Sequence, residues 1–184
     1  MKLKLIVVFS LLLTLGYCTL YNLATEEKTI TDSDRPKSNE GIAVFRFVSD
    51  NKATLPSEIF FQIKEKNSIP KHFSLSSLFN TKDISRFIFL EKGIYYFKEI
   101  VYRFDGNIES FPFPANSFKI QPNRINYIGD ITFYYSRRGT KLRVKDNMKR
   151  TMWDFYKKYP TLSVQYPLVK NILLIERPFK EFEK

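Results

Sequence analysis

The sequence predicts a mainly β protein: a single antiparallel β-sandwich with one C-terminal helix, preceded by a signal peptide and a flexible tether. Short runs rich in Phe, Tyr, Ile and Val recur along the chain, which holds 18 Phe and 11 Tyr in 184 residues. Turn signals such as Asp50-Asn51 and Asp105-Gly106 separate these runs. The chain has one cysteine, which excludes an intramolecular disulfide, so the fold must depend on its hydrophobic core.

The N-terminus has the pattern of a secretory signal. Lys2 and Lys4 precede an apolar run, 5–15, that is interrupted only by Ser10 and Thr14. A charged region followed by an apolar region of this length is typical of a signal peptide, and the apolar region is too short to span a bilayer. Because the two lysines stay inside, we expect everything after residue 25 to lie across the membrane.

The end of this run, Leu15-Gly16-Tyr17-Cys18, resembles the lipobox of bacterial lipoproteins, in which a peptidase cuts before a lipid-modified cysteine. Cys18 is therefore the candidate lipidation site, and 1–18 is the predicted signal peptide. Tyr17 stands where that peptidase takes a small residue, so two alternatives stay open. Signal peptidase would cut after Cys18 and release a soluble domain, or the uncharged stretch 5–25 would remain as a membrane anchor.

Residues 19–41 are predicted to form a flexible linker, and residues 42–184 the folded domain. The stretch ATEEKTITDSDRPKSNEG, 24–41, is polar and charged and has almost no large apolar side chain. Such a segment cannot bury enough apolar surface to fold by itself. The length that remains suits one domain, and the sequence shows no internal repeat and no second linker.

Seven segments of the domain have the length and composition of strands, since aromatic and β-branched residues alternate within them between turn residues. They are Gly41–Val48, Glu58–Lys64, Ser85–Leu90, Gly93–Tyr102, Ser117–Gln121, Arg124–Tyr135 and Lys141–Lys145. Gly129 lies inside an aromatic strand and is expected to mark a bulge or the close approach of another backbone. Tyr127 beside it is expected to bury its ring and keep a hydrogen-bond partner for its hydroxyl.

One helix is predicted over about 147–158, after Asp146 as its N-cap and before Pro160 as its end. Its apolar residues recur at steps of four, three and four and therefore share one face: Met148, Met152, Phe155 and Tyr159. This face is expected to pack on the sheet. The segment that follows is expected to supply a last edge strand, with a break at Pro167.

Two stretches, FLEKGIYYFKEI at 89–100 and FKIQPNRINYIGDITFYY at 118–135, together resemble a prealbumin-like β-sandwich domain of small, uncharacterised exported bacterial lipoproteins. In that family a turn glycine introduces a strand with a prominent tyrosine, and a later hairpin carries Tyr-Ile-Gly. Gly93 fills the first pattern, and Tyr127 begins the second. Asn123 replaces the usual turn glycine and is expected to adopt positive φ. The resemblance implies a prealbumin-like or immunoglobulin-like sandwich and brings no catalytic residue.

Basic residues dominate the chain, whose formal net charge is +11. They concentrate between residues 136 and 158, opposed there only by Asp146 and Asp154. The candidate anion-binding residues are Arg137, Arg138, Lys141, Arg143, Lys145, Lys149 and Arg150. For an exported protein this patch favours an anionic envelope polymer, a host glycan or lipid phosphates over nucleic acid. The alternative is that these side chains only protect a strand edge from aggregation.

A second candidate surface is the segment around Phe111 and Phe113, whose alternating prolines favour an extended connection. These rings are candidate contacts for a protein partner, unless they fold back over one end of the sandwich.

Motifs for catalysis or cofactor binding are missing from the sequence. It contains no nucleotide-binding glycine loop, no Gly-x-Ser-x-Gly turn and no zinc-ligand spacing, and His72, the only histidine, is expected in an exposed loop. No catalytic residue, metal or cofactor is predicted. The sequence favours an exported, lipid-anchored envelope protein with a non-enzymatic binding or structural role. An envelope hydrolase would need two buried carboxylates that face each other in a cleft.

Overall fold

The computed structural model shows a mainly β protein with two sheets and two helices, which confirms the predicted class at that level. The predicted signal peptide, 1–18, and the candidate lipidation site Cys18 lie outside the described part of the chain. The structure describes residues 25–26, 30–49, 55–64, 69–75, 83–104, 107–113, 115–136 and 139–175.

One sheet has seven strands and the other has five. In spatial order the larger sheet consists of β1 (Thr25–Glu26), β4 (Lys71–Ser74), β3 (Glu58–Ile63), β6 (Gly93–Phe104), β8 (Asn116–Ile120) and β12 (Leu174–Ile175), with β7 (Asn107–Pro112) paired to β6. The smaller sheet consists of β10 (Gly139–Lys145), β9 (Ile125–Ser136), β2 (Glu40–Ser49) and β5 (Asp83–Glu91), with β11 (Leu168–Lys170) beside β9. All seven predicted strands are present, with ends within two residues of the predicted ones.

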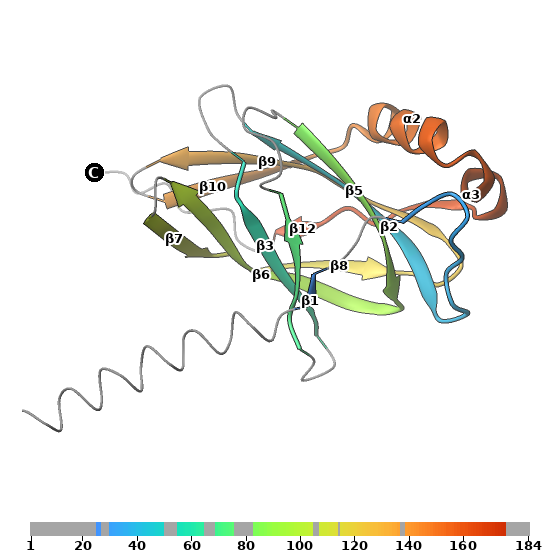
Figure 1. Cartoon of the computed structure of the whole chain (residues 1–184), viewed down its shortest axis with the longest axis horizontal. Helices are drawn as coiled ribbons and strands as arrows, with labels where there is room; N and C mark the ends of the chain where they lie inside the picture. Colours follow the sequence, from blue (N-terminus) through green and yellow to red (C-terminus); the bar gives the residue numbers. More distant parts are fainter. Residues whose placement is uncertain are drawn as a thin grey trace, which may run out of the picture.

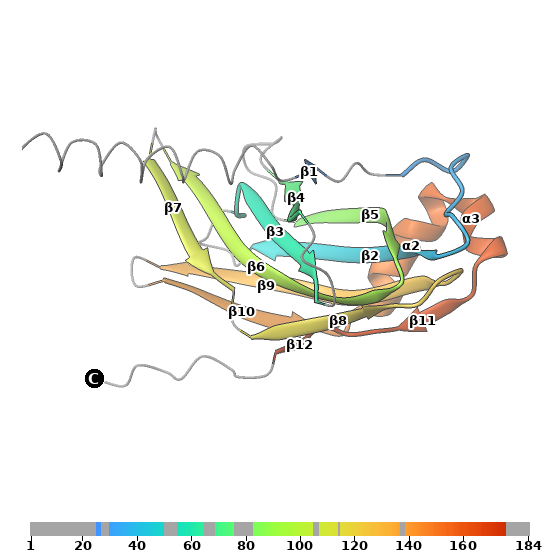
Figure 2. The same ribbon diagram turned by 90° about the horizontal axis from the view of Figure 1, so that it is seen from below.

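The two helices are α2 (Met148–Lys158) and α3 (Pro160–Gln165). They lie together at one end of the molecule, as two views at right angles show (Figure 1, Figure 2).

A core of aromatic rings lies between the two sheets, so the architecture is sandwich-like. Phe45 of the smaller sheet contacts Phe73 and Phe118 of the larger sheet edge to face, with ring centroids 5.2 and 5.4 Å apart. Edge-to-face packing places the positive edge of one ring on the negative face of another and adds to the energy of burial. These contacts explain how a chain with one cysteine folds without a disulfide.

The middle of the smaller sheet is buried on both faces, because the helices pack on β2 and β9 on the side that points away from the first core. Strand β2 is therefore buried almost without interruption, unlike a strand with one wet face. Its residues Ile42 and Val44 face a second core with Met152 and Phe155 of α2 and with Tyr159, which lies between the two helices. The prediction that this helix face packs on the sheet is confirmed.

The expectation of a purely antiparallel sandwich is wrong at three strand pairs: β2 with β9, β11 with β9, and β1 with β4 are parallel. The turn before β9 lies beside the start of β2, since the amide of Asn123 donates to the carbonyl of Glu40 at 2.8 Å. Both strands leave from this point and run in the same direction. Asn123 has a φ of 53°, which confirms the positive φ predicted for it.

The predicted flexible linker, 19–41, is wrong for residues 30–41. Ile30 is buried in the second core, and its amide donates to the carbonyl of Phe87 at 3.0 Å. The hydroxyl of Tyr159 donates to the carbonyl of Ile30, also at 3.0 Å. Burial, followed by the negative charges of Asp34 and Asp32, raises the pKa of Tyr159 to about 12, so this hydroxyl keeps its proton at neutral pH.

The end of the predicted helix and the segment after it also differ from the prediction. Pro160 ends α2 but begins α3, where its missing amide hydrogen costs nothing. Asp32 accepts hydrogen bonds from the amides of Thr161 and Leu162 at 3.1 and 3.2 Å, which satisfies the start of this short helix. The expected edge strand begins only after Pro167, as β11.

Candidate functional site

The cations predicted on a solvent face of β10 are confirmed where the structure describes them. Arg143 and Lys145 are exposed, whereas Leu142 and Val144 pack against the core between the sheets. Strand β10 pairs only with β9, so it is an edge of the described sheet. The side chain of Lys141 and both of the candidate residues Arg137 and Arg138 lie outside the described residues.

The helix that follows extends this basic surface, because Lys149 and Arg150 are exposed in its first turn. Arg150 is partly neutralised by Asp83, at 3.7 Å between Nη2 and Oδ2. Within the part of the chain that the structure describes, Arg143, Lys145 and Lys149 make no ion pair. We call these three residues the basic face. Cations that are not paired with an acid remain available to an anionic ligand.

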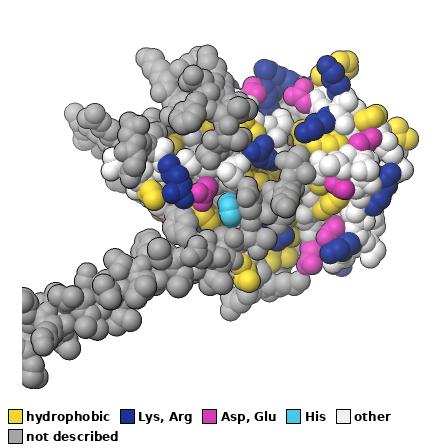
Figure 3. Space-filling model, in the orientation of Figure 1, with side chains coloured by type: hydrophobic (Ala, Val, Ile, Leu, Met, Phe, Trp, Pro, Cys, Tyr) yellow, Lys and Arg dark blue, Asp and Glu magenta, His cyan; other side chains and the backbone are white. Residues whose placement is uncertain are grey.

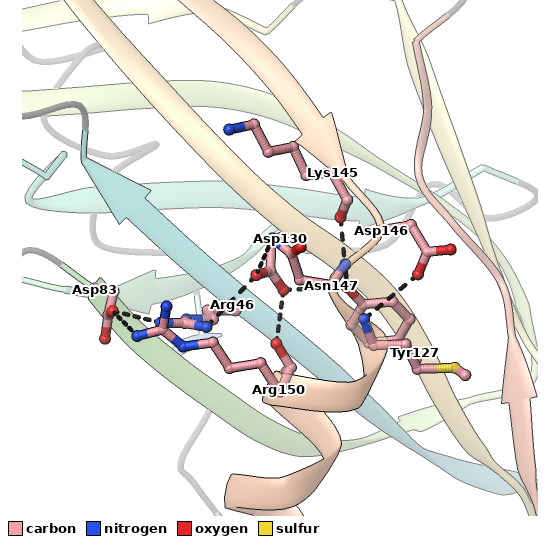
Figure 4. Close-up of polar contacts among 10 residues, drawn as sticks. Arg46, Asp83, Tyr127, Asp130, Lys145, Asp146, Asn147 and Arg150 are labelled. Carbon is pink, nitrogen blue, oxygen red and sulfur yellow. Dashed lines mark hydrogen bonds and ion pairs between the residues drawn. The ribbon is translucent and has the colours of Figure 1, made fainter.

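A buried polar cluster lies beneath the start of α2, and the sequence did not predict it (Figure 4). Its centre is Asp130 on β9, which is only 2% exposed. Arg46 on β2, also buried, lies opposite it, with 3.6 Å between Nη1 and Oδ2. Arg46 also donates to Oδ2 of Asp83 at 2.5 Å. The two carboxylates thus share one guanidinium.

A β-bulge at Gly129 places Asp130 opposite Arg46. Val44 pairs with Tyr127 but Phe45 pairs with Gly129, so β9 has one extra residue at this point. The extra residue turns Asp130 toward the helix side of the sheet, where Arg46 also points. Gly129 has a φ of 123°, which side chains disfavour, and a Cβ there would lie 2.8 Å from Cγ1 of Val144. The predicted bulge is confirmed.

Asp130 accepts hydrogen bonds from three other side chains in addition to its ion pair. The hydroxyl of Thr151 donates at 2.7 Å, the hydroxyl of Tyr127 at 3.1 Å, and the amide of the Asn147 side chain at 3.2 Å. The hydroxyl of Tyr127 in turn accepts from the backbone amide of Asn147 at 3.0 Å. Burial, followed by the charge of Asp130, raises the pKa of Tyr127 well above its ordinary value, so it stays a donor. The predicted hydroxyl partner is confirmed.

This cluster joins the helix to the sheet. Asp130 at its centre is buried. Its carboxylate accepts hydrogen bonds from Thr151 of α2 and from Asn147, the N-cap of that helix. On the sheet, Tyr127 donates a further hydrogen bond to it and Arg46 forms the ion pair. A carboxylate held in this way stabilises packing and has no free position for a substrate atom. One signal in the sequence points to it: Arg46 and Asp130 are opposite charges inside two otherwise apolar strands, and a buried charge needs a partner.

Phe111 and Phe113, the candidate partner contacts, both turn inward. Phe113 is 8% exposed and stacks on Phe97 with 4.9 Å between centroids, and Phe111 packs against the core beside Tyr102. Part of the expected extended connection is strand β7, paired with β6. The structure therefore does not display these rings to a partner.

His72 is not in an exposed loop, so that expectation is wrong. It lies on β4 opposite Phe60, with ring centroids 5.3 Å apart. Among the residues that the structure describes, no three His, Cys, Asp or Glu side chains are placed to hold a metal ion. Nor is any helix in the described ranges both long and apolar enough to cross a membrane.

Comparisons with family models, with curated proteins and with solved structures found no match to this chain.

Proposed function

We propose that this protein is an exported, membrane-held envelope protein with a non-enzymatic role, and that it binds an anionic polymer of the envelope or of a host surface through the basic face. The observation that carries this proposal is the exposure of Arg143, Lys145 and Lys149 without a described ion pair. Alternate residues of a strand lie about 7 Å apart. Arg143 and Lys145 therefore present charges in a row, which suits a chain with repeated anionic groups.

Side-chain packing and a hydrogen bond hold the backbone of β10, which carries Arg143 and Lys145. Leu142 and Val144 pack into the core, and the hydroxyl of Tyr127 lies 3.4 Å from the carbonyl of Lys145. Cations on a rigid frame lose less conformational entropy on binding than cations on a loop. This support favours a binding role over simple protection of a strand edge.

The N-terminal sequence supports export and attachment. The apolar run, 5–15, and Cys18 at its end suit a lipid anchor, and the resemblance of 89–100 and 118–135 favours a prealbumin-like type of sandwich. A non-enzymatic role is supported by Asp83 and Asp130, because these carboxylates pair with Arg46 instead of facing each other across a cleft.

Retention of the full chain on heparin tests the proposed binding. We expect elution above ~0.5 M salt, where the Debye length is about 4 Å and generic attraction is screened. The double variant Lys145→Glu/Lys149→Glu is expected to bind at least about 20-fold more weakly, since each cation near a polyanionic surface contributes about 1 kcal/mol.

The matched control is Lys98→Glu/Lys119→Glu, which changes the net charge equally at exposed positions of the larger sheet. It is expected to elute close to the unaltered chain. If both double variants lose retention to the same extent, or if the unaltered chain elutes near physiological salt, the basic face is generic charge and the proposal fails.

A further inference from the structure

The outer face of α2 displays a large aromatic side chain to solvent. Trp153 is 70% exposed, Tyr156 beside it is 40% exposed, and Val164 on α3 is 88% exposed. Most other aromatic rings of the described residues are buried or half-buried, so the exposure of Trp153 differs from the rest of the described chain. Trp153 and Tyr156 are three residues apart on α2 and are therefore neighbours on its surface, and an exposed apolar patch of this kind is a candidate interaction surface.

Basic side chains surround Trp153 along the helix. Residues three and four apart on a helix are neighbours, and for Trp153 these include Lys149, Arg150 and Lys157. The sequence of α2 contains a single acid, Asp154. We call Trp153, Tyr156 and Lys157 the aromatic face, and in Figure 3 hydrophobic, basic and some acidic side chains lie next to each other at the end of the molecule that carries α2 and α3.

The opposite side of α2 packs against the rest of the protein. Met152 and Phe155 are buried in the second core, and the hydroxyl of Thr151 donates to Asp130. The helix therefore cannot turn its aromatic face inward. Within the described residues, nothing covers Trp153.

We infer that the aromatic face docks on the surface of an anionic phospholipid bilayer. Trp and Tyr favour the interface between headgroups and hydrocarbon, where the ring is in an apolar layer and its polar atom stays wet. Lysine and arginine around them attract anionic headgroups. The exposed Trp and Tyr therefore suit the interface between headgroups and hydrocarbon, and the flanking cations suit the anionic headgroups.

Charge complementarity favours this occupant over a second copy of the chain. A symmetric dimer through the aromatic face would bring together two α2 helices that each carry four cations and one acid, Asp154, and Asp83 pairs with only one of these cations, Arg150. A bilayer with anionic lipid offers opposite charge over the whole face. The inference does not rest on the proposed function, because it needs neither a lipid on Cys18 nor binding to a polymer.

Trp153 is the only tryptophan in the 184 residues, so its fluorescence reports this face directly in the full chain. The chain is mixed with phosphatidylcholine vesicles with and without phosphatidylglycerol. With phosphatidylglycerol we expect emission to shift to shorter wavelength, together with quenching by brominated lipid and protection from acrylamide. Attachment through the N-terminus alone would leave Trp153 in water and its emission unchanged.

Two single variants separate docking from general charge. Lys157→Glu is expected to lower the ratio of docked to undocked chain by at least about fivefold, because a lysine near an anionic surface contributes roughly that factor. Lys119→Glu makes the same change of charge at an exposed position on β8 and is expected to leave the shift intact. Neither variant alters Arg143, Lys145 or Lys149, so both variants are expected to keep their heparin retention while only Lys157→Glu loses docking.

Four results would overturn the inference. The first is emission that stays water-exposed on phosphatidylglycerol vesicles, and the second is an equal shift on phosphatidylcholine alone. The third is a shift without vesicles that grows with protein concentration, which would assign the face to self-association. The fourth is a shift with heparin but not with vesicles, which would assign the face to polymer binding.

Discussion

Replacing Asp130 with alanine is expected to lower the free energy of unfolding by about 3–5 kcal/mol, the range found when one partner of a buried ion pair is removed. The reason is that Asp130 holds the sheet to α2. Without it, Arg46 keeps only Asp83, and the hydroxyls of Thr151 and Tyr127 lose a buried acceptor. Each unsatisfied buried donor costs about 1–3 kcal/mol. The measurement is urea unfolding followed by circular dichroism.

Asp154→Ala is the matched control, since it removes an exposed carboxylate from α2 and should change stability by about 0.5 kcal/mol or less. The paired replacement Arg46→Met with Asp130→Leu is expected to be less destabilising than Asp130→Ala, because it leaves no buried charge alone. A loss below about 1 kcal/mol for Asp130→Ala would contradict the assignment of Asp130 as the centre of the cluster.

Gly41→Ala is expected to destabilise the protein by about 3 kcal/mol, at the upper end of the usual cost of overpacking. Gly41 lies at the start of β2, and an added Cβ would overlap the backbone carbonyl oxygen of Gln121 and lie 2.6 Å from Nδ2 of Asn126. A backbone atom cannot move aside as a side chain can. Displacing Asn126 also weakens its hydrogen bonds to the carbonyls of Gln121 and Arg124, both at 3.0 Å.

Chemical denaturation tests this prediction as well. Lys119→Ala, an exposed substitution on β8, serves as the control and should stay within about 0.5 kcal/mol of the unaltered chain. A Gly41→Ala variant with unchanged stability would show that the β8–β9 turn does not lie against β2 as described.

The sequence predicted the strands in which aromatic and β-branched residues alternate between nearby turn residues, because this pattern lies within one short segment. Strand β4 was missed because four residues around a histidine carry too little pattern, and β7 because Pro112 at its end and Pro114 after it favour an extended connection. Helix α3 was expected as part of a strand. Its start depends on Asp32, about 130 positions earlier in the chain, and no local pattern contains that contact.

The same limit applies to the candidate sites. Gly129 and Tyr127 were predictable because a glycine in an aromatic strand and a buried tyrosine have local consequences. The pairing of Arg46 with Asp130 was not, since it depends on the parallel register of β2 and β9 and on the bulge between them. The exposure of Trp153 was also not predicted, because helical periodicity identifies the residues that pack on the sheet and does not show what covers the other side of the helix.

Export of the domain is the central claim, because the proposed ligand is an anionic polymer outside the cytoplasm. The most direct test is the intact mass of the mature chain from membrane and soluble fractions of the cells that make it. We predict a chain in the membrane fraction that begins at an acylated Cys18. A full-length chain that retains Met1 and is dissolved in the cytosol would contradict the claim.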